Sequence, residues 1–153
     1  MTSDVHAARL SAAIWECDRH SAALVDALAD WHRAPAADLN ALEQDSGMRR
    51  LTDQLLFRFT KLQDAMGERL VPATLAWLRE AHEAWPMRDR LDRLERLGYL
   101  DVEVWLQWRD VRNRLAHEYP NQPTLRFAAL LATVNAVQAM VQAYGRWKLK
   151  LPA

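Results

Sequence analysis

Apolar residues recur at intervals of three and four along almost the whole chain, which is the spacing of one buried helix face. This spacing predicts a first helix from Ser3 or Asp4, either of which can cap it, to His32. Further helices are predicted over 48–66, 72–84, 88–97, 102–118 and 124–147. No segment alternates apolar and polar residues as a half-buried strand does. We therefore predict one all-α domain over residues 1–153, an up-and-down bundle of about five to six helices.

Proline and glycine residues predict where the helices stop. Pro35 ends the first helix, because the residue before a proline is pushed out of the helical region, and a helical connector or a loop follows to Gly47. Gly67 is expected to end the second helix, and Pro72 to lie in the first turn of the third, where its missing N–H costs little. Gly98 is expected just after the fourth helix. The remaining helices are separated by Trp85-Pro86, by an Asp101 cap and by the YPNQP loop at 119–123.

The composition excludes several classes of protein and site. Half of the residues are hydrophobic, 26% are charged and the net charge is zero, which is not the composition of a disordered chain. Four glycines in the whole chain argue against a phosphate-cradling glycine loop. The single cysteine, Cys17, excludes an intrachain disulfide and a cysteine-rich zinc site, and its position on an apolar stripe predicts a place in the core. We expect no metal or other cofactor, because no ligand spacing links His6, His20, His32 and His82.

A cytoplasmic location is expected. The first residues show no basic-then-apolar leader, and no uninterrupted apolar run approaches the roughly 20 residues that cross a bilayer. A single cysteine also fits a reducing compartment.

The neutral total charge hides an asymmetry. Residues 1–46 hold eight acidic and three basic side chains, a net of −5, so the rest of the chain carries +5, and the first helix (1–34) is acidic. Arginine outnumbers lysine by 17 to 3, and its planar fork suits phosphate groups. The charge pattern is compatible with nucleic-acid binding, and equally with an arginine-rich composition that has no functional cause.

One segment, WLQWRDVRNRLAHEYP from Trp105, carries groups able to do chemistry. On a helical wheel, its core stripe is formed by Val104, Trp108, Val111 and Leu115. Arg109, Asn113 and His117 recur every four residues on the far side, and Arg112 and Tyr119 lie near the boundary between the faces. Histidine can exchange a proton near neutral pH, and arginine can hold phosphate oxygens through two donors. A solvated helix face laced with ion pairs remains the alternative for these residues, Arg114 included.

This segment resembles the signature of HEPN-domain proteins of the HepT toxin type. The pattern is Arg112 followed by the polar Asn113, then His117 after four intervening residues, and Tyr119 two positions further on. The RFTKLQD run at 58–64 is also similar to the second helix of a subgroup of these proteins. The resemblance covers about residues 48–147, and the acidic first helix matches less well.

The resemblance implies a metal-independent endoribonuclease that acts as a homodimer and as the toxin of a toxin–antitoxin pair. Arg112 and His117 would be the catalytic residues, with support from Asn113, Arg109 and Arg114. Implied partners are RNA, either tRNA or mRNA, and a cognate antitoxin, either a minimal nucleotidyltransferase or a Toprim-like protein. In HepT-type members a tyrosine at the position of Tyr119 can be nucleotidylated, which silences the toxin. The alternative is a catalytically silent HEPN-like binding module, or a substrate of a nucleotidyltransferase.

Overall fold

The computed structural model describes residues 2–152, and in this part of the chain every regular element is a helix. The elements are α1 (Thr2–Arg33), α2 (Leu39–Gln44), α3 (Ser46–Ala65), the π-helical turn η1 (Met66–Leu70), α4 (Val71–Trp77), α5 (Met87–Arg96), α6 (Val102–Leu115) and α7 (Pro123–Leu149). Because α3, η1 and α4 follow one another without a break, they form one rod. The predicted all-α bundle of five to six helices is confirmed.

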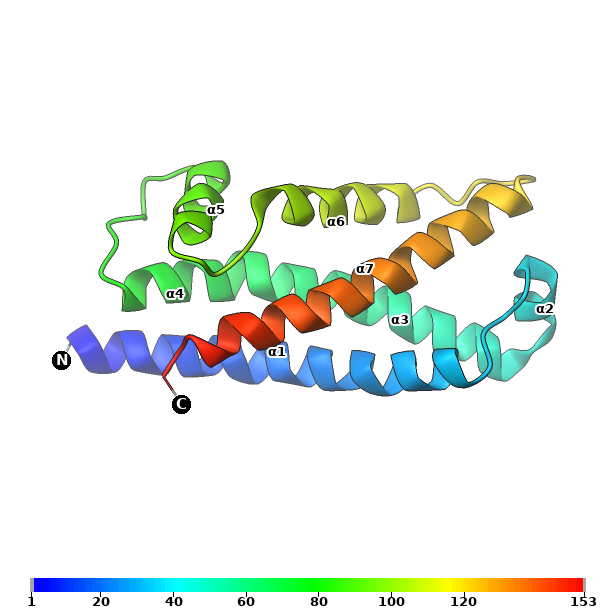
Figure 1. Cartoon of the computed structure of the whole chain (residues 1–153), viewed down its shortest axis with the longest axis horizontal. Coiled ribbons are helices and arrows are strands. Elements are labelled where there is room, and N and C mark those ends of the chain that lie inside the picture. Colours follow the sequence, from blue (N-terminus) through cyan, green and yellow to red (C-terminus); the bar gives the residue numbers. More distant parts are fainter. Residues whose placement is uncertain (1, 153) are drawn as a thin grey trace.

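The long helices run up and down the molecule (Figure 1). α1 lies beside the rod of α3, η1 and α4, which runs in the opposite direction, and α2 closes the turn between them. α6 follows the direction of α1, and α7 returns diagonally across the bundle, in contact with α6, α1 and α3. The start of α1 and the end of α7 therefore lie at the same end of the bundle.

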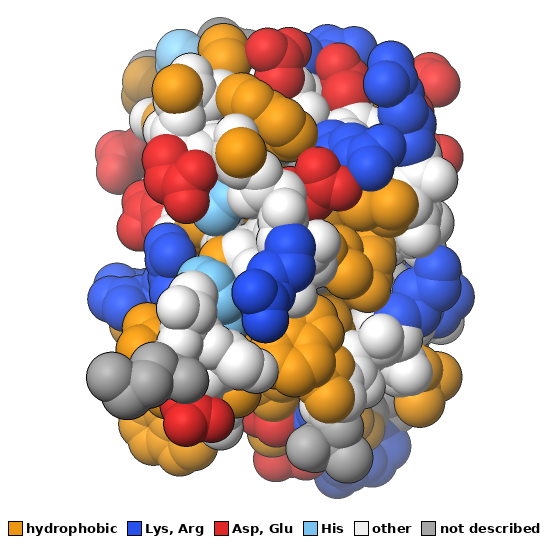
Figure 2. Space-filling model, turned by 90° about the vertical axis from the view of Figure 1, so that its left-hand side faces the viewer, with side chains coloured by type: hydrophobic (Ala, Val, Ile, Leu, Met, Phe, Trp, Pro, Cys, Tyr) orange, Lys and Arg blue, Asp and Glu red, His pale blue; other side chains and the backbone are white. Residues whose placement is uncertain are grey.

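α5 and the loop before it cover that end of the bundle and carry charges of both signs. Arg88 pairs with Asp92 at 3.2 Å, and Arg93 of α5 pairs with Glu80 of the loop at 2.7 Å. Figure 2 shows basic and acidic side chains next to one another on this end, with hydrophobic side chains between them. The surface at this end of the bundle is therefore neither mainly positive nor mainly negative.

The core combines apolar residues from all the long helices. Trp147 of α7 is only 1% exposed, and its Nε1 donates a hydrogen bond to the Thr74 hydroxyl of α4 at 3.1 Å. Its ring lies 5.9 Å from that of Tyr99. Cys17 is fully buried, as predicted from its apolar stripe, and burial raises the pKa of its thiol to about 12. Cys17 is therefore a core residue without a reactive thiolate at neutral pH.

The predicted break at Gly67 is wrong, because the helix continues through η1. The N–H of Val71 donates to the carbonyl of Met66, five residues earlier, which widens this turn. Pro72 follows directly, and the wide turn accommodates a proline that would clash with the fourth preceding carbonyl of a regular helix. Gly67 has a packing role instead: a Cβ at this position would lie 3.3 Å from Cζ2 of Trp105 in α6.

Two further helix ends differ from the sequence-based expectation. α4 ends at Trp77 instead of Ala84, and residues 78–86 form a loop in which Arg79 adopts a left-handed φ of 63°. α6 ends at Leu115 instead of Glu118. The predicted Asp101 cap is confirmed, because its side chain accepts a hydrogen bond from the N–H of Val104 at 3.1 Å. The predicted Ser3 or Asp4 cap is wrong, because α1 is already helical at Thr2.

α7 is long and apolar enough, by length and composition, to cross a membrane. The helix contains no uninterrupted apolar run of that length, because Asn135, Gln138 and Gln142 lie between its apolar residues. A core helix of a soluble domain passes the same test, and 39% of the apolar window of α7 is buried against the other helices. One such helix is weak evidence for a membrane span, and the cytoplasmic location stays a prediction.

The free energy of unfolding is expected to fall as the pH decreases below the ordinary pKa of histidine, because of His20. Burial and, next, the charge of Arg58 lower the pKa of His20 from 6.5, while Glu16 opposes them. Below pH 6.5 the unfolded chain then binds a proton that the folded chain does not, so acid favours unfolding. Urea unfolding between about pH 7.5 and about pH 5.5 measures the effect. If the unfolding free energy of His20→Gln depends on pH as that of the parent does, groups other than His20 cause the effect.

Candidate functional site

α6 presents one face to the core and the other to solvent. Its buried residues are Val102, Trp105, Trp108 and Val111. The predicted core stripe is therefore correct at Trp108 and Val111, whereas Val104 and Leu115 are only partly buried. Arg109, Asn113 and Arg114 are exposed, in agreement with their predicted place on the polar face.

Arg112 connects α6 to α3 through a two-point ion pair. Its Nη1 donates to Oδ1 of Asp64, and its Nη2 lies 3.4 Å from Oδ2 of the same carboxylate. Both side chains are about one-third exposed. The pair orients the guanidinium and uses two of its five N–H donors, which leaves three donors for another anion.

His117 and Tyr119 lie in the segment that follows α6. The backbone N–H of His117 donates to the carbonyl of Arg114 at 3.1 Å, which turns the chain away from the helix axis. Tyr119 has a φ of +46°, in the left-handed region that few residues with a side chain adopt. The two rings are 6.1 Å apart and inclined by 53°, so an exposed imidazole and a partly buried phenol stand side by side.

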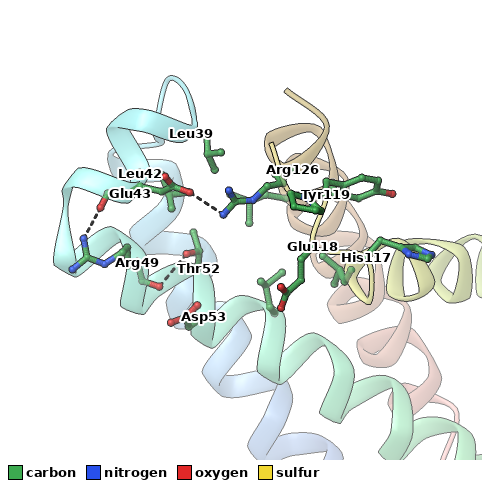
Figure 3. Close-up of a pocket in the computed structure, with 15 residues that line it drawn as sticks. Leu39, Leu42, Glu43, Arg49, Thr52, Asp53, His117, Glu118, Tyr119 and Arg126 are labelled. Carbon is green, nitrogen blue, oxygen red and sulfur yellow. Dashed lines mark hydrogen bonds and ion pairs between the residues drawn. The ribbon is translucent and has the colours of Figure 1, made fainter. Parts of the chain in front are cut away.

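A hollow of about 720 Å³ opens between this segment, α2, the start of α3 and the start of α7. His117, Glu118 and Tyr119 line one side of it, and Arg49 and Arg126 lie among the lining residues of the other elements. Figure 3 shows the side chains of His117 and Tyr119 projecting to the same side, while Arg126 reaches across toward α2. There it donates to the Glu43 carboxylate at 2.9 Å.

A second hollow, of about 340 Å³, lies between α6 and the junction of α3 with η1. Arg109, Arg112 and Asn113 line it from α6, and Gln63 and Asp64 from α3. Gln63 is 4% exposed, and its Oε1 has no hydrogen-bond partner among the described residues. This side of the site therefore combines cationic donors with a buried amide oxygen that lacks a donor.

The structure brings the predicted site residues together in two groups. Arg109, Arg112 and Asn113 line the second hollow, whereas His117 and Tyr119 line the first. The proposed catalytic pair, Arg112 and His117, is thus not gathered in one pocket of a single chain. Arg114 contributes a backbone carbonyl, and its exposed side chain makes no hydrogen bond or ion pair within residues 2–152.

Several residues of the two hollows were not recognised in the sequence. Asp64 lies in the run 58–64, but its pairing with Arg112 joins positions 48 residues apart and has no local signal. The same applies to Arg126, which meets Glu43 across 83 residues. Only the arginine-rich composition of the chain beyond residue 46 points to cations of this kind.

Within residues 2–152, no three side chains of the metal-ligating types His, Cys, Asp and Glu are placed to hold an ion. Comparisons with protein-family models, with curated proteins and with solved structures gave no match to this chain. The resemblance to HEPN proteins therefore rests on the residues at the end of α6 and on the helical fold.

Proposed function

We propose that the chain is a metal-independent endoribonuclease of the HEPN type, acting on cytoplasmic RNA as the toxin of a toxin–antitoxin pair. The observation that carries the proposal is the placement of Arg112, Asn113 and His117 at the end of α6. In this all-α bundle the imidazole is exposed and the guanidinium is oriented with free donors. These are the two groups that cleavage of RNA through its own 2′-OH requires.

The reaction needs no group beyond the RNA and the protein. The 2′ oxygen attacks the phosphorus, the bond from phosphorus to the 5′ oxygen breaks, and the products are a 2′,3′-cyclic phosphate and a 5′-OH. One imidazole takes the proton of the 2′-OH, and a second, protonated imidazole gives a proton to the leaving oxygen. Arg112 stabilises the charge that develops on the phosphate oxygens.

A homodimer would complete this site. One chain offers one His117, and its Arg112 lines a different hollow, so the second imidazole and a facing Arg112 would come from the partner. A twofold axis beside the exposed face of α6 that carries Arg109 and Asn113, with Leu106 near its centre and His117 in the segment that follows, would produce this arrangement. Asp64 then acts as a positioning residue, because it holds the Arg112 guanidinium.

RNA cleavage is expected to persist in excess EDTA and to leave cyclic phosphate ends, because the acidic residues near the motif, Asp110 and Glu118, alternate with arginines. The measurement is digestion of a labelled RNA by the purified chain with and without chelator, followed by analysis of the termini. A parallel preparation of His117→Ala controls for contaminating nuclease. Loss of cleavage in EDTA with recovery in magnesium would contradict the mechanism.

Two observations favour the silent binding module as the second candidate. Arg112 is already held by Asp64, and the Tyr119 ring lies beside His117 on a loop where a transferase could approach it. In this case the chain would be a substrate of a nucleotidyltransferase, and His117 would have no part in proton transfer.

Tyr119→Phe is expected to stay toxic but to escape an antitoxin that works by nucleotidylation, because it keeps the ring and removes the acceptor hydroxyl. Coexpression with the transferase, growth measurement and intact-mass analysis for an added nucleotide test this. Tyr99→Phe is the matched control, since Tyr99 packs against Trp147 far from the motif. A Tyr119→Phe variant that is still modified would place the modification elsewhere, and an unmodified parent silenced by its antitoxin would favour a Toprim-like partner.

A further inference from the structure

Two aromatic side chains outside the hollows are unusually exposed, and each lies against cations. Trp15 of α1 is 62% exposed, and the Arg19 guanidinium lies 4.8 Å from its ring centroid. Phe57 of α3 is 55% exposed, and Arg58 and Lys61 lie 5.7 and 5.6 Å from its ring. We call these five residues the aromatic–basic surface.

The five residues belong to neighbouring elements. α1 and α3 pack side by side (Figure 1), and Arg58 Nη1 crosses between them to donate to His20 Nδ1 at 2.9 Å. The charges of Arg58, Arg19 and Lys61 all contribute to lowering the pKa of this imidazole. The two aromatic–cation clusters therefore lie on adjacent helices that Arg58 links.

The aromatic–basic surface keeps its positive charge. Within residues 2–152, none of Arg19, Arg58 and Lys61 forms an ion pair within 4.0 Å. The nearest acidic residue of α1, Glu16, is engaged by Arg69 at 2.7 Å, and Asp18 is engaged by Lys148 at 2.9 Å. Three cations without an acidic partner thus lie beside two exposed rings.

We propose that the aromatic–basic surface binds single-stranded nucleic acid. Bases stack on the exposed rings of Trp15 and Phe57, and the phosphates are held by Arg19, Arg58 and Lys61. Proteins that bind single strands without sequence preference combine these two elements, cations that follow the backbone and aromatic faces that accept any base. The proposal rests on the proposed function only in naming RNA, instead of DNA, as the strand.

The surface fits a bilayer or a second copy of the chain less well. Membrane docking needs a continuous apolar helix face, whereas the other large apolar residues exposed on α1, Val5 and Val25, are each ten residues, about 15 Å, from Trp15. A twofold contact through the surface would bring its three cations against their own copies. A polyanion with flat bases complements both the charge and the rings.

The test uses a fluorescent 2′-O-methyl oligouridine of about 12 nucleotides, within the length range that such surfaces bind. Methylation removes the nucleophile, so fluorescence anisotropy reports binding without cleavage. Trp15→Ala and Phe57→Ala are each expected to weaken binding about 5- to 150-fold, and Trp15→Phe to retain it. Lys61→Gln should reduce the slope of log affinity against log salt by about 0.7.

Matched controls are Val25→Ala, an exposed apolar residue of the same helix, and Arg88→Gln, an exposed arginine paired with Asp92. Circular dichroism checks that each variant folds. The proposal is overturned if the parent does not bind, or if the alanine variants bind as the parent does. It is also overturned if Trp15→Ala and Phe57→Ala lose affinity for anionic vesicles or lose the dimer instead.

Binding and cleavage can fail separately. His32→Ala is expected to bind the methylated oligonucleotide as the parent does, because His32 is an exposed histidine in the last turn of α1 and lies outside the aromatic–basic surface. If the parent binds this strand but cleaves no RNA, the proposed ribonuclease fails and the binding surface stands. If RNA is cleaved but Trp15→Ala and Phe57→Ala bind the oligonucleotide as the parent does, the proposed binding surface fails and the proposed ribonuclease stands.

Discussion

Replacing His117 with alanine is expected to abolish RNA cleavage and growth arrest while leaving the fold unchanged. The imidazole is exposed and has no core contact to lose, so the free energy of unfolding should stay within about 0.5 kcal/mol of the parent. Proton transfer by a positioned side chain contributes about 100- to 10,000-fold to a reaction rate. In the proposed dimer the substitution removes both the acid and the base. Inducible expression and a cleavage assay measure the loss.

His32→Ala is the matched control, because His32 is also an exposed histidine but lies in the last turn of α1. It should cleave and arrest growth as the parent does. If His117→Ala is as active and as toxic as the parent, the catalytic role of His117 is wrong and the binding module takes its place.

Arg112→Ala is expected to lower the cleavage rate about 100- to 1,000-fold, which is the cost of removing one donor that stabilises a developing anion. Arg112→Lys should recover little of this rate, because a point charge cannot bind a carboxylate and a phosphate through separate arms of a planar fork. Single-turnover kinetics on a short RNA, at saturating protein, measure the chemical step for both variants.

Asp64→Ala separates lost chemistry from lost packing, since it breaks the same ion pair and keeps the guanidinium. Because the pair is partly exposed, either substitution should cost at most about 1 kcal/mol of unfolding free energy, measured in urea. Asp64→Ala should lower the rate, but less than Arg112→Ala does, because the guanidinium is kept and is no longer positioned. Equal loss in the two variants would show that the ion pair, and not a phosphate contact, is what activity needs.

The parts of the fold that depend on local sequence were predictable. The spacing of apolar residues located α1, α6 and α7 to within a few residues, because a buried helix face imposes its period on the sequence. The Asp101 cap and the helix end before Gly98 were also correct. Gly98 has a φ of +85°, a conformation that glycine adopts without strain.

The parts that depend on tertiary contacts were not predictable. Gly67 is a breaking signal in isolation, yet the rod continues through η1 and Gly67 packs against Trp105. Pro72, by contrast, lies in the first turn of α4 as predicted. Residues 78–84 were expected to be helical, because the sequence does not show that the Glu80 carboxylate pairs with Arg93 of α5. Such contacts join distant positions and leave no periodic pattern.

The candidate site shows the same division. The exposure of Arg109 and Asn113 follows from their place on the helical wheel. The placement of Arg112 and His117 in two different hollows does not, because the wheel assumed that the helix continues to Glu118. In fact α6 ends at Leu115, and the turn that follows carries His117 to the other hollow. Neither this end nor the Asp64 contact could be read from the residues alone.

The wide turn η1 determines which way the last part of the rod faces. A turn closed by a bond to the fifth residue holds one residue more than an α-helical turn, and each residue of an α-helix rotates the chain by about 100°. The extra residue therefore rotates the buried face of α4 relative to that of α3, although the spacing of apolar residues within each helix is regular. The Thr74 hydroxyl, which accepts a hydrogen bond from the Trp147 indole, lies beyond this offset. Deleting one residue from η1 would remove the offset and turn that hydroxyl away from its partner.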